Sequence, residues 1–204
     1  MFITLEGGEG AGKSTQARLL VAALARAGIP ARLTREPGGA PGAEVLRGLL
    51  LSRSHEWSAE AEIYLHFAAR SEHLARIILP ALDAGTVVVC DRFADSTMAY
   101  QGYGLGADRT LIAALTHLLP RRPDLTLVLQ VSPGVAATRI AERHQALDRY
   151  ESMDSAFHAR VAQGFAAIAA AEPGRCVTIP ADGTAEGVHQ AIRRAVAPHV
   201  PGLA

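Results

Sequence analysis

Residues 2–15, with the sequence FITLEGGEGAGKST, decide the fold of this chain. Positions 7–14 within this stretch fit the pattern G-x-x-x-x-G-K-[ST] at every constrained position. An apolar strand precedes the glycines and a helical pattern begins at Lys13, which is the order that a phosphate-binding loop requires. The glycines let successive backbone N–H groups turn toward phosphate oxygens at the positive end of the helix. We expect the following residues to bind the phosphates of a nucleotide: Gly7, Gly8, Glu9, Gly10, Ala11, Gly12, Lys13, Ser14 and Thr15.

Lys13 is the only lysine in the chain, and every other strongly basic side chain is an arginine. A lysine ammonium is a compact point charge that reaches between the β- and γ-phosphates, whereas an arginine guanidinium is a broad planar fork. Lysine and arginine together number 20, so chance would place the single lysine at this position about one time in twenty. We therefore expect Lys13 to bind the donor phosphates and to act in catalysis.

A second stretch, TVVVCD at residues 86–91, is an apolar strand that ends in a carboxylate. In P-loop proteins such an aspartate holds Mg²⁺, and the hydroxyl that follows the P-loop lysine binds the same ion. We therefore expect Ser14 and Asp91 to bind Mg²⁺. A role for Asp91 as a helix or turn cap is the alternative that the sequence leaves open.

The composition is that of one globular domain without a strongly charged partner. The chain has 204 residues, of which 49% are hydrophobic and 20% charged, so it can bury a large core. Lys+Arg and Asp+Glu number 20 each, so no overall positive field draws the protein to nucleic acid or to an anionic membrane. The N-terminus has neither a basic segment nor a long apolar one, and we expect a cytoplasmic protein. Cys90 and Cys176 have no CxxC partner and are expected in the core.

Apolar runs of strand length alternate with longer helical patterns, which is typical of a parallel sheet with helices on both faces. We predict an α/β fold of the P-loop NTPase type with a five-stranded parallel sheet, as one domain over residues 1–204. Pro80 predicts a kink or a break near the end of the longest helix, and residues 198–204 are expected to be a frayed tail. The expected strands are 2–6, 31–34, 87–90, 125–131 and 176–179, and the expected helices are 13–27, 44–51, 58–84, 108–118, 135–143, 152–171 and 184–196.

The rest of the chain narrows the class of reaction. A GTPase normally needs an N-K-x-D motif to read guanine, and this motif is absent because Lys13 is the only lysine. A motor or repair ATPase often carries a basic face for nucleic acid, which the balanced charge disfavours. A small-molecule kinase fits better, because it needs a second phosphate site and arginines that converge on the transferred group. The candidate arginines are Arg35, Arg92, Arg139, Arg143 and Arg149.

Several longer motifs resemble those of the thymidylate kinase family. They are EGGEGAGKST at residues 6–15, TREPGG at 34–39, DRF at 91–93, STMAYQG at 96–102 and LDRYE at 147–151. These motifs follow the family's order across nearly the whole chain, and the second and fourth are much more specific than the P-loop alone. The resemblance implies the phosphorylation of dTMP to dTDP with ATP and Mg²⁺, which is a step of dTTP synthesis, by a homodimer.

The resemblance also implies roles for individual side chains on the acceptor side. Arg35 and Arg92 correspond to the pair that orients the acceptor phosphate, and Glu9 corresponds to a P-loop carboxylate near the acceptor sugar. Tyr100 corresponds to a ring that crowds the 2′ position and so favours deoxyribose. The positions at which the family reads the polar edge of the base are Arg70, Thr97 and Gln101.

One departure from the family concerns the ring that stacks on the base. The family usually places an aromatic side chain four residues before the base-reading arginine, and this chain has His66 there. Phe67 lies three residues before Arg70. Both spacings keep a ring on the same side of a helix as the arginine, so both rings stay candidates. We predict that Phe67 is the one that stacks on the base.

A mobile lid is expected over residues 139–151. In one subset of the family an arginine in the P-loop reaches the transferred phosphoryl group, and this P-loop has no arginine. The chain therefore resembles the bacterial type, in which a lid arginine has that role. The lid is less basic than in many relatives, so the sequence does not decide between two candidates, Arg143 and Arg149.

The expected acceptor needs no strong general base. A phosphate monoester has a second pKa of about 6 and is largely dianionic near neutral pH. Catalysis must then come from the alignment of two phosphates and from positive charge around the transferred group. Two alternatives remain on the sequence alone: another nucleoside monophosphate kinase, and a regulator that binds ATP without transferring phosphate.

Overall fold

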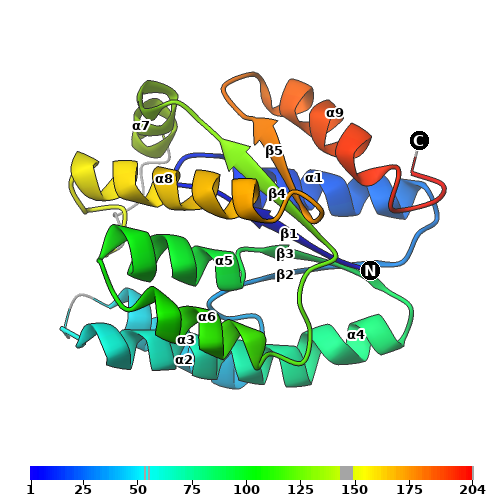
Figure 1. The fold of residues 1–204 in the computed structure, drawn as a ribbon. Helices are drawn as coiled ribbons and strands as arrows, with labels where there is room; N and C mark the ends of the chain where they lie inside the picture. The colour runs from blue at the N-terminus through cyan, green and yellow to red at the C-terminus, as the bar shows by residue number, and fades with distance from the viewer. Residues whose placement is uncertain (53, 55, 143–148, 204) are drawn as a thin grey trace.

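The structure is a computed structural model that describes residues 1–52, 54, 56–142 and 149–203. Its centre is a sheet of five parallel strands in the spatial order β2-β3-β1-β4-β5 (Figure 1). This arrangement confirms the predicted α/β fold with a five-stranded parallel sheet. The strands are β1 (Phe2–Glu6), β2 (Ala31–Arg35), β3 (Val87–Asp91), β4 (Leu125–Gln130) and β5 (Cys176–Pro180).

Helices cover both faces of the sheet (Figure 1). On one face, α1 (Lys13–Arg26) and α9 (Ala185–Val196) pack over Ile3 and Leu5 of β1 in the largest apolar cluster. Phe2 of the same strand enters a cluster on the opposite face, because side chains alternate along a strand. The other helices of the described chain are α2 (Pro41–Leu51), α3 (Ala59–His73), α4 (Leu79–Asp83), α5 (Ala94–Thr97), α6 (Arg109–His117), α7 (Pro133–Ala141) and α8 (Ser155–Ala171).

The order of the strands brings the two predicted nucleotide motifs together. β1 pairs with β3, and Leu5 lies beside Asp91 in the register. Because both strands are parallel, the loops that follow them leave the sheet at the same edge, where open α/β sheets bind their ligands. The P-loop after β1 and the segment after Asp91 are therefore neighbours in space.

The long helical pattern at residues 58–84 changes its geometry near the end. α3 passes into a π-helical segment, η1 (Leu74–Ile78), which is followed by α4. Pro80 lies in the first turn of α4. Proline has no N–H to donate to the carbonyl four residues earlier, and its ring clashes with that carbonyl, so a wider turn before it relieves the conflict. The helical segment continues to Asp83, so Pro80 is accompanied by a π-helical turn and not by a break.

Two regions differ from the expectation. Residues 94–104, predicted only as a motif, form α5 and a second π-helical segment, η2 (Met98–Gly104). The tail also differs, because Val200 and Leu203 are buried in the cluster beneath α1 and α9. The expectation of a frayed tail is therefore wrong for its described residues: two apolar side chains anchor it to the core.

The two cysteines are core residues, as predicted. Cys90 and Cys176 are both buried and unpaired. Burial raises the pKa of the Cys176 thiol to about 11 and that of Cys90 well above its usual value, so both thiols stay protonated. In the part of the chain that the structure describes, no helix is both long and apolar enough to cross a bilayer.

Candidate active site

A cavity of about 660 Å³ opens at the edge of the sheet where β1 and β3 end. The P-loop forms one part of its wall, and side chains of α3, α5 and η2 form another. Its volume is typical of a small-molecule site. The predicted site residues that line it are Glu9, Gly10, Gly12, Lys13, Ser14, Thr15, Arg35, Arg70, Asp91, Arg92, Thr97, Tyr100 and Gln101.

The P-loop adopts a conformation that depends on its glycines. Gly7, Gly10 and Gly12 have φ angles of 136°, 70° and 88°, which side chains other than glycine rarely adopt. A Cβ at Gly10 would also lie 2.6 Å from the carbonyl oxygen of Ala136. Gly12 is the N-cap of α1, so the first N–H groups of that helix, which have no partner within it, face the loop. The backbone therefore forms a site for anions.

Lys13 is almost fully buried at this wall of the cavity. Its Nζ donates a hydrogen bond of 2.7 Å to the carbonyl oxygen of Gly8, which ties the ammonium to the loop. Burial, and after it the charge of Arg92, lowers the pKa of Lys13 to about 8. A phosphate anion beside the ammonium favours its charged form, so a bound nucleotide would raise this pKa again.

Ser14 and Asp91 lie together beside the P-loop. The Ser14 hydroxyl donates to Oδ2 of Asp91, and within the described structure the buried Oδ1 of Asp91 has no hydrogen-bond partner. An unpaired carboxylate oxygen next to a hydroxyl fits Mg²⁺, which prefers oxygen ligands. Among the described residues no group of three or more His, Cys, Asp or Glu side chains suits a metal. A site with two protein ligands matches Mg²⁺, which usually completes its shell with water and substrate phosphates.

Arg92 follows Asp91 and is held from several sides. Its Nη2 lies 2.5 Å from Oε1 of Glu9, and its Nη1 donates to the carbonyl oxygen of Gly7 over 3.2 Å. The Cζ of Arg92 lies 4.8 Å from the centre of the Tyr100 ring, whose hydroxyl donates to the same oxygen of Glu9. Burial opposes the positive charge, but Glu9 and the other acidic groups nearby together more than offset it, so the pKa of Arg92 lies above its usual value. Arg92 is a permanent, positioned cation.

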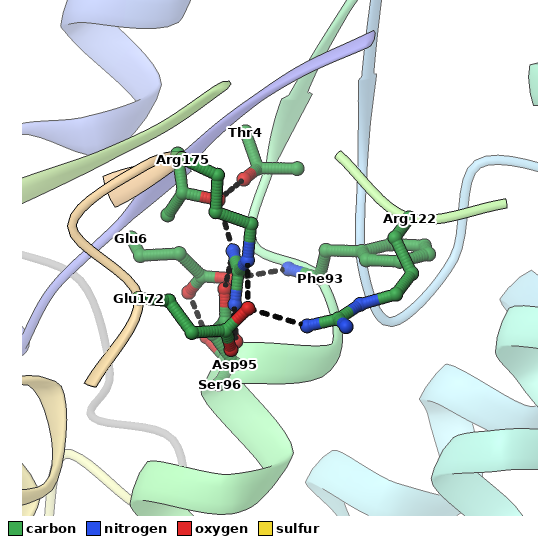
Figure 2. A network of polar contacts seen from close by, with 9 residues as sticks. Thr4, Glu6, Phe93, Asp95, Ser96, Arg122, Glu172 and Arg175 are labelled. Carbon is green, nitrogen blue, oxygen red and sulfur yellow. Dashed lines mark hydrogen bonds and ion pairs between the residues drawn. The ribbon is translucent and has the colours of Figure 1, made fainter. Parts of the chain in front are cut away.

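The backbone around Arg92 is fixed by a buried carboxylate. Arg92 has a φ of 70°, a left-handed conformation that is rare for a large side chain. Glu6 accepts hydrogen bonds from the N–H of Phe93 over 2.7 Å and from the hydroxyl of Ser96 over 2.5 Å (Figure 2). The Ser96 hydroxyl is also 3.3 Å from Nη1 of Arg92. Burial, followed by the nearby charge of Asp95, raises the pKa of Glu6 to about 8.

Asp95, in the same segment, is anchored to the far strands of the sheet. Both of its carboxylate oxygens accept from Arg175, over 2.7 and 2.8 Å. Arg175 also donates to the Thr126 hydroxyl and to Glu172, which pairs with Arg122 (Figure 2). This network connects α5 to β4 and to the start of β5, and so supports the loop that carries Arg92.

The chain resembles known proteins along almost its whole length. The Thymidylate kinase family model matches residues 5–192. The chain belongs to the thymidylate kinase family. A thymidylate kinase of Gluconobacter oxydans is 52% identical over 200 residues, which cover 96% of this chain and 94% of that protein. A thymidylate kinase of Caulobacter vibrioides is 50% identical over 194 residues, which cover 94% of this chain and 93% of that protein. The crystal structure of thymidylate kinase from Ehrlichia chaffeensis matches with a TM-score of 0.78 and 36% identity, over 96% of this chain and 97% of that chain.

Arg70, the residue that the likeness to the thymidylate kinase family assigns to the base, lines the cavity from α3. Its Nε donates to Glu36 over 2.7 Å, and its Nη2 donates to the Thr97 hydroxyl over 3.1 Å. His73 lies 3.0 Å from the other oxygen of Glu36, so this carboxylate is fixed on both sides. Within the described structure the buried Nη1 of Arg70 has no hydrogen-bond partner. Arg70 therefore offers an unpaired donor to a ligand.

The structure places Phe67 in an apolar cluster and not among the residues that line the cavity. This ring packs with Ile63 and Ile112 in an apolar cluster, 4.8 Å from the guanidinium carbon of Arg70. His66, in contrast, is one of the residues that line the cavity. Neighbouring side chains on an α-helix point about 100° apart, so the two rings face different surroundings. Burial, followed by the charge of Arg70, lowers the pKa of His66 to about 3, so this ring in the cavity wall is neutral.

Two further arginines of the cavity wall contact other parts of the protein. The Nη2 of Arg35 lies 3.2 Å from both carboxylate oxygens of Glu44, in a pair that is about half exposed. Such exposed pairs are weak, so a phosphate can displace Glu44. Arg139 donates to the carbonyl oxygens of Ala181 and Gly183, over 2.8 Å each, and so holds the loop after β5 near the P-loop.

Of the two lid candidates, Arg143 lies outside the described residues and Arg149 lies within them. The Nη1 of Arg149 is 2.7 Å from Oε2 of Glu62, a buried residue of α3. The next residue, Tyr150, donates its hydroxyl to Oε1 of Glu62 over 2.8 Å. In the described conformation Arg149 is therefore paired on the base side of the cavity.

The sequence analysis did not identify the side chains that hold the residues of the cavity wall in place. Glu36 lies inside the TREPGG motif and Tyr150 inside LDRYE, so the motifs could have indicated both. Glu6 ends the first strand, where a buried carboxylate is unusual. Glu62 lies on a helix that begins with several acidic residues, and nothing in its spacing separates it from an exposed Glu60.

Proposed function

We propose that this protein transfers the γ-phosphoryl group of ATP to dTMP, forming dTDP and ADP. The observation that carries the proposal is one continuous cavity whose wall includes both the P-loop and Arg70. A donor bound at the P-loop and a monophosphate whose base reaches Arg70 would bring their phosphates together near Arg92. Membership of the thymidylate kinase family supports ATP as the donor and dTMP as the acceptor.

The donor phosphates bind to the backbone N–H groups of residues 7–15 and to the Lys13 ammonium, which is the role of such a loop in P-loop enzymes. Ser14 and Asp91 would hold Mg²⁺. When bound, this ion neutralises charge on the β- and γ-phosphates. The fit of the two oxygens supports this role, because Asp91 keeps one buried oxygen without a partner in the described structure.

The acceptor binds across the other half of the cavity. Arg92 and Arg35 hold its phosphate. For this contact, Arg35 gives up its ion pair with Glu44. Glu9 and the ring of Tyr100, joined by a hydrogen bond of 2.8 Å, lie beside the deoxyribose. The residues that contact the base are Arg70, Thr97, Gln101 and His66.

The transfer step needs no proton acceptor from the protein. An oxygen of the dTMP phosphate attacks the γ-phosphorus of ATP, the bond from that phosphorus to the bridging oxygen breaks, and ADP leaves with the electron pair. The acceptor phosphate is already largely dianionic, since its second pKa is about 6. Lys13 and Arg92 place positive charge on the donor and acceptor sides, which offsets the repulsion between the two phosphates.

We infer the remaining features from the family likeness of the motifs. One domain spans the chain, and residues 139–151 act as a lid that closes over the phosphates and excludes water. Arg149, or Arg143 outside the described residues, then reaches the transferred group. The protein works as a homodimer in the cytoplasm, where ATP and dTMP are available. The equal numbers of acidic and basic residues, 20 each, give no reason to expect a nucleic-acid or membrane partner.

A coupled assay with ATP and Mg²⁺ over the acceptors dTMP, dUMP, dCMP, dGMP and AMP tests the proposed function. We expect dTMP to have the highest kcat/KM, with the purine nucleotides about 10³-fold or more below it. The buried polar groups of a site that fits one base are left without hydrogen-bond partners when a different base is bound. A chelator should stop the reaction. Preference for any other acceptor would reject dTMP and indicate another nucleoside monophosphate kinase.

A further inference from the structure

Glu62 is a buried carboxylate behind the base side of the cavity, with 1% of its surface exposed. Donors from separate parts of the chain surround it. The Nε2 of Gln101 donates to Oε1 over 2.9 Å, and the Tyr150 hydroxyl donates to the same oxygen over 2.8 Å. The Nη1 of Arg149 lies 2.7 Å from Oε2 as an ion pair. Glu62 therefore connects α3 with η2 and with the segment that carries Arg149.

The contacts of Glu62 determine which end of the Gln101 amide remains for a ligand. The amide has a donor end and an acceptor end of nearly the same shape, so its surroundings decide its orientation. An ionised carboxylate only accepts hydrogen bonds, so Nε2 has to face Glu62. The second hydrogen of Nε2 points to the Tyr150 hydroxyl over 3.0 Å. With both hydrogens used inside the protein, Oε1 is the group that Gln101, which lines the cavity, presents to a ligand.

An acceptor on Gln101 and a donor on Arg70 match one class of pyrimidine. The buried Nη1 of Arg70 has no hydrogen-bond partner within the described residues. Thymine and uracil present a carbonyl acceptor beside an N3–H donor, whereas cytosine presents an amino donor beside an N3 acceptor. Arg70 can therefore donate to the carbonyl while Gln101 accepts from N3–H. With cytosine, the donor of Arg70 would face the amino donor of the base, and the acceptor of Gln101 would face the N3 acceptor.

We propose that Glu62 is a positioning residue that sets this selectivity by holding Gln101 with Oε1 toward the acceptor base. The inference rests on the proposed function, because it concerns the acceptor of that reaction. The same carboxylate also pairs with Arg149. Glu62 therefore contacts both the Gln101 amide and the segment at the end of the predicted lid. Without the carboxylate, the amide of Gln101 can turn over and present its donor end to cytosine.

The substitution Glu62→Gln tests this role, because it keeps the size of the side chain and replaces the carboxylate by an amide that both donates and accepts. We expect the ratio of kcat/KM for dTMP to that for dCMP to fall about tenfold or more. The change should appear mainly as a higher KM for dTMP together with a higher kcat/KM for dCMP. The matched control is Glu60→Gln on the same helix, whose exposed carboxylate accepts from the Tyr64 hydroxyl over 3.0 Å. That control should keep the wild-type ratio.

The outcomes separate this inference from the proposed function. A wild-type protein that does not phosphorylate dTMP would remove the proposed function, and this inference with it. If the wild type prefers dTMP but Glu62→Gln leaves the ratio unchanged, or lowers kcat/KM equally for both acceptors, Glu62 is structural and the inference is overturned.

A second variant keeps the test decisive if Glu62→Gln does not fold. Tyr150→Phe leaves Glu62 charged and removes one of the two acceptors of Gln101 Nε2. It should lower the same ratio by about threefold, a smaller effect because the carboxylate still orients the amide. A tenfold or larger fall in this variant would mean that Tyr150 orients the amide without Glu62, and it would overturn the inference.

Discussion

Replacement of Arg92 by alanine is expected to lower kcat about 10³-fold and to leave the KM for ATP within about threefold of the wild-type value. The guanidinium belongs to the proposed acceptor site, and it is held by Glu9 and by the carbonyl oxygen of Gly7. Its loss removes a fixed charge from the place where negative charge develops during transfer. Donor binding depends on the backbone N–H groups of the P-loop and on Lys13, which this substitution does not replace. Steady-state kinetics with both substrates varied provide the measurement.

Two further variants separate the charge of Arg92 from its backbone. Its φ of 70° strains alanine by about 1 kcal/mol but suits glycine, so Arg92→Gly should lose the same activity without that strain. Arg76→Ala removes an exposed arginine that pairs with Glu72, and it should keep the wild-type kcat. Wild-type turnover in Arg92→Ala would take Arg92 out of the mechanism.

The second large effect is expected at Lys13. Lys13→Ala should lower kcat/KM for ATP about 10³-fold, because it removes the one cation that the P-loop itself supplies to the transferred phosphate. Lys13→Arg should not restore activity. The ammonium is buried and donates to the carbonyl oxygen of Gly8 over 2.7 Å, and a broad planar guanidinium does not reproduce this compact point charge. Kinetics of both variants, with ATP binding followed by calorimetry, check this prediction.

The single lysine allows a chemical version of the same test. An amine-directed reagent can modify Lys13 and the N-terminal amine, since the chain has no other lysine. Activity should fall in proportion to the modification of Lys13, which peptide mass mapping measures. ATP should protect Lys13 from modification and should preserve the activity. Complete modification of Lys13 with full activity would contradict its assignment to the donor phosphates.

The parts of the site that could be predicted are those whose residues lie close together in the sequence. The P-loop needs glycines at fixed spacing directly before a helix, so residues 7–15 were recognisable without a structure. The apolar strand that ends at Asp91 was recognisable for the same reason. The parallel sheet followed from the alternation of strand and helix patterns, because parallel strands need long crossovers between them.

The parts that could not be predicted depend on contacts between distant residues. Glu62 meets Tyr150 from 88 positions away, and Arg175 meets Asp95 from 80 positions away, so no local pattern indicates either pair. The sequence could not separate His66 from Phe67 for another reason. Both satisfy the helical spacing from Arg70, and only the packing of Phe67 against Ile112 shows which ring is in the core.

Transfer of the γ-phosphate label from ATP distinguishes a kinase from a protein that only binds nucleotide. With γ-labelled ATP, Mg²⁺ and dTMP, we expect the label to appear in dTDP and little of it in inorganic phosphate, because the acceptor phosphate and not water occupies the place beside Arg92. Without dTMP, little ATP should be consumed. If the protein binds ATP in calorimetry but forms no labelled dTDP, it binds nucleotide without transferring phosphate, and the account given for the cavity is wrong.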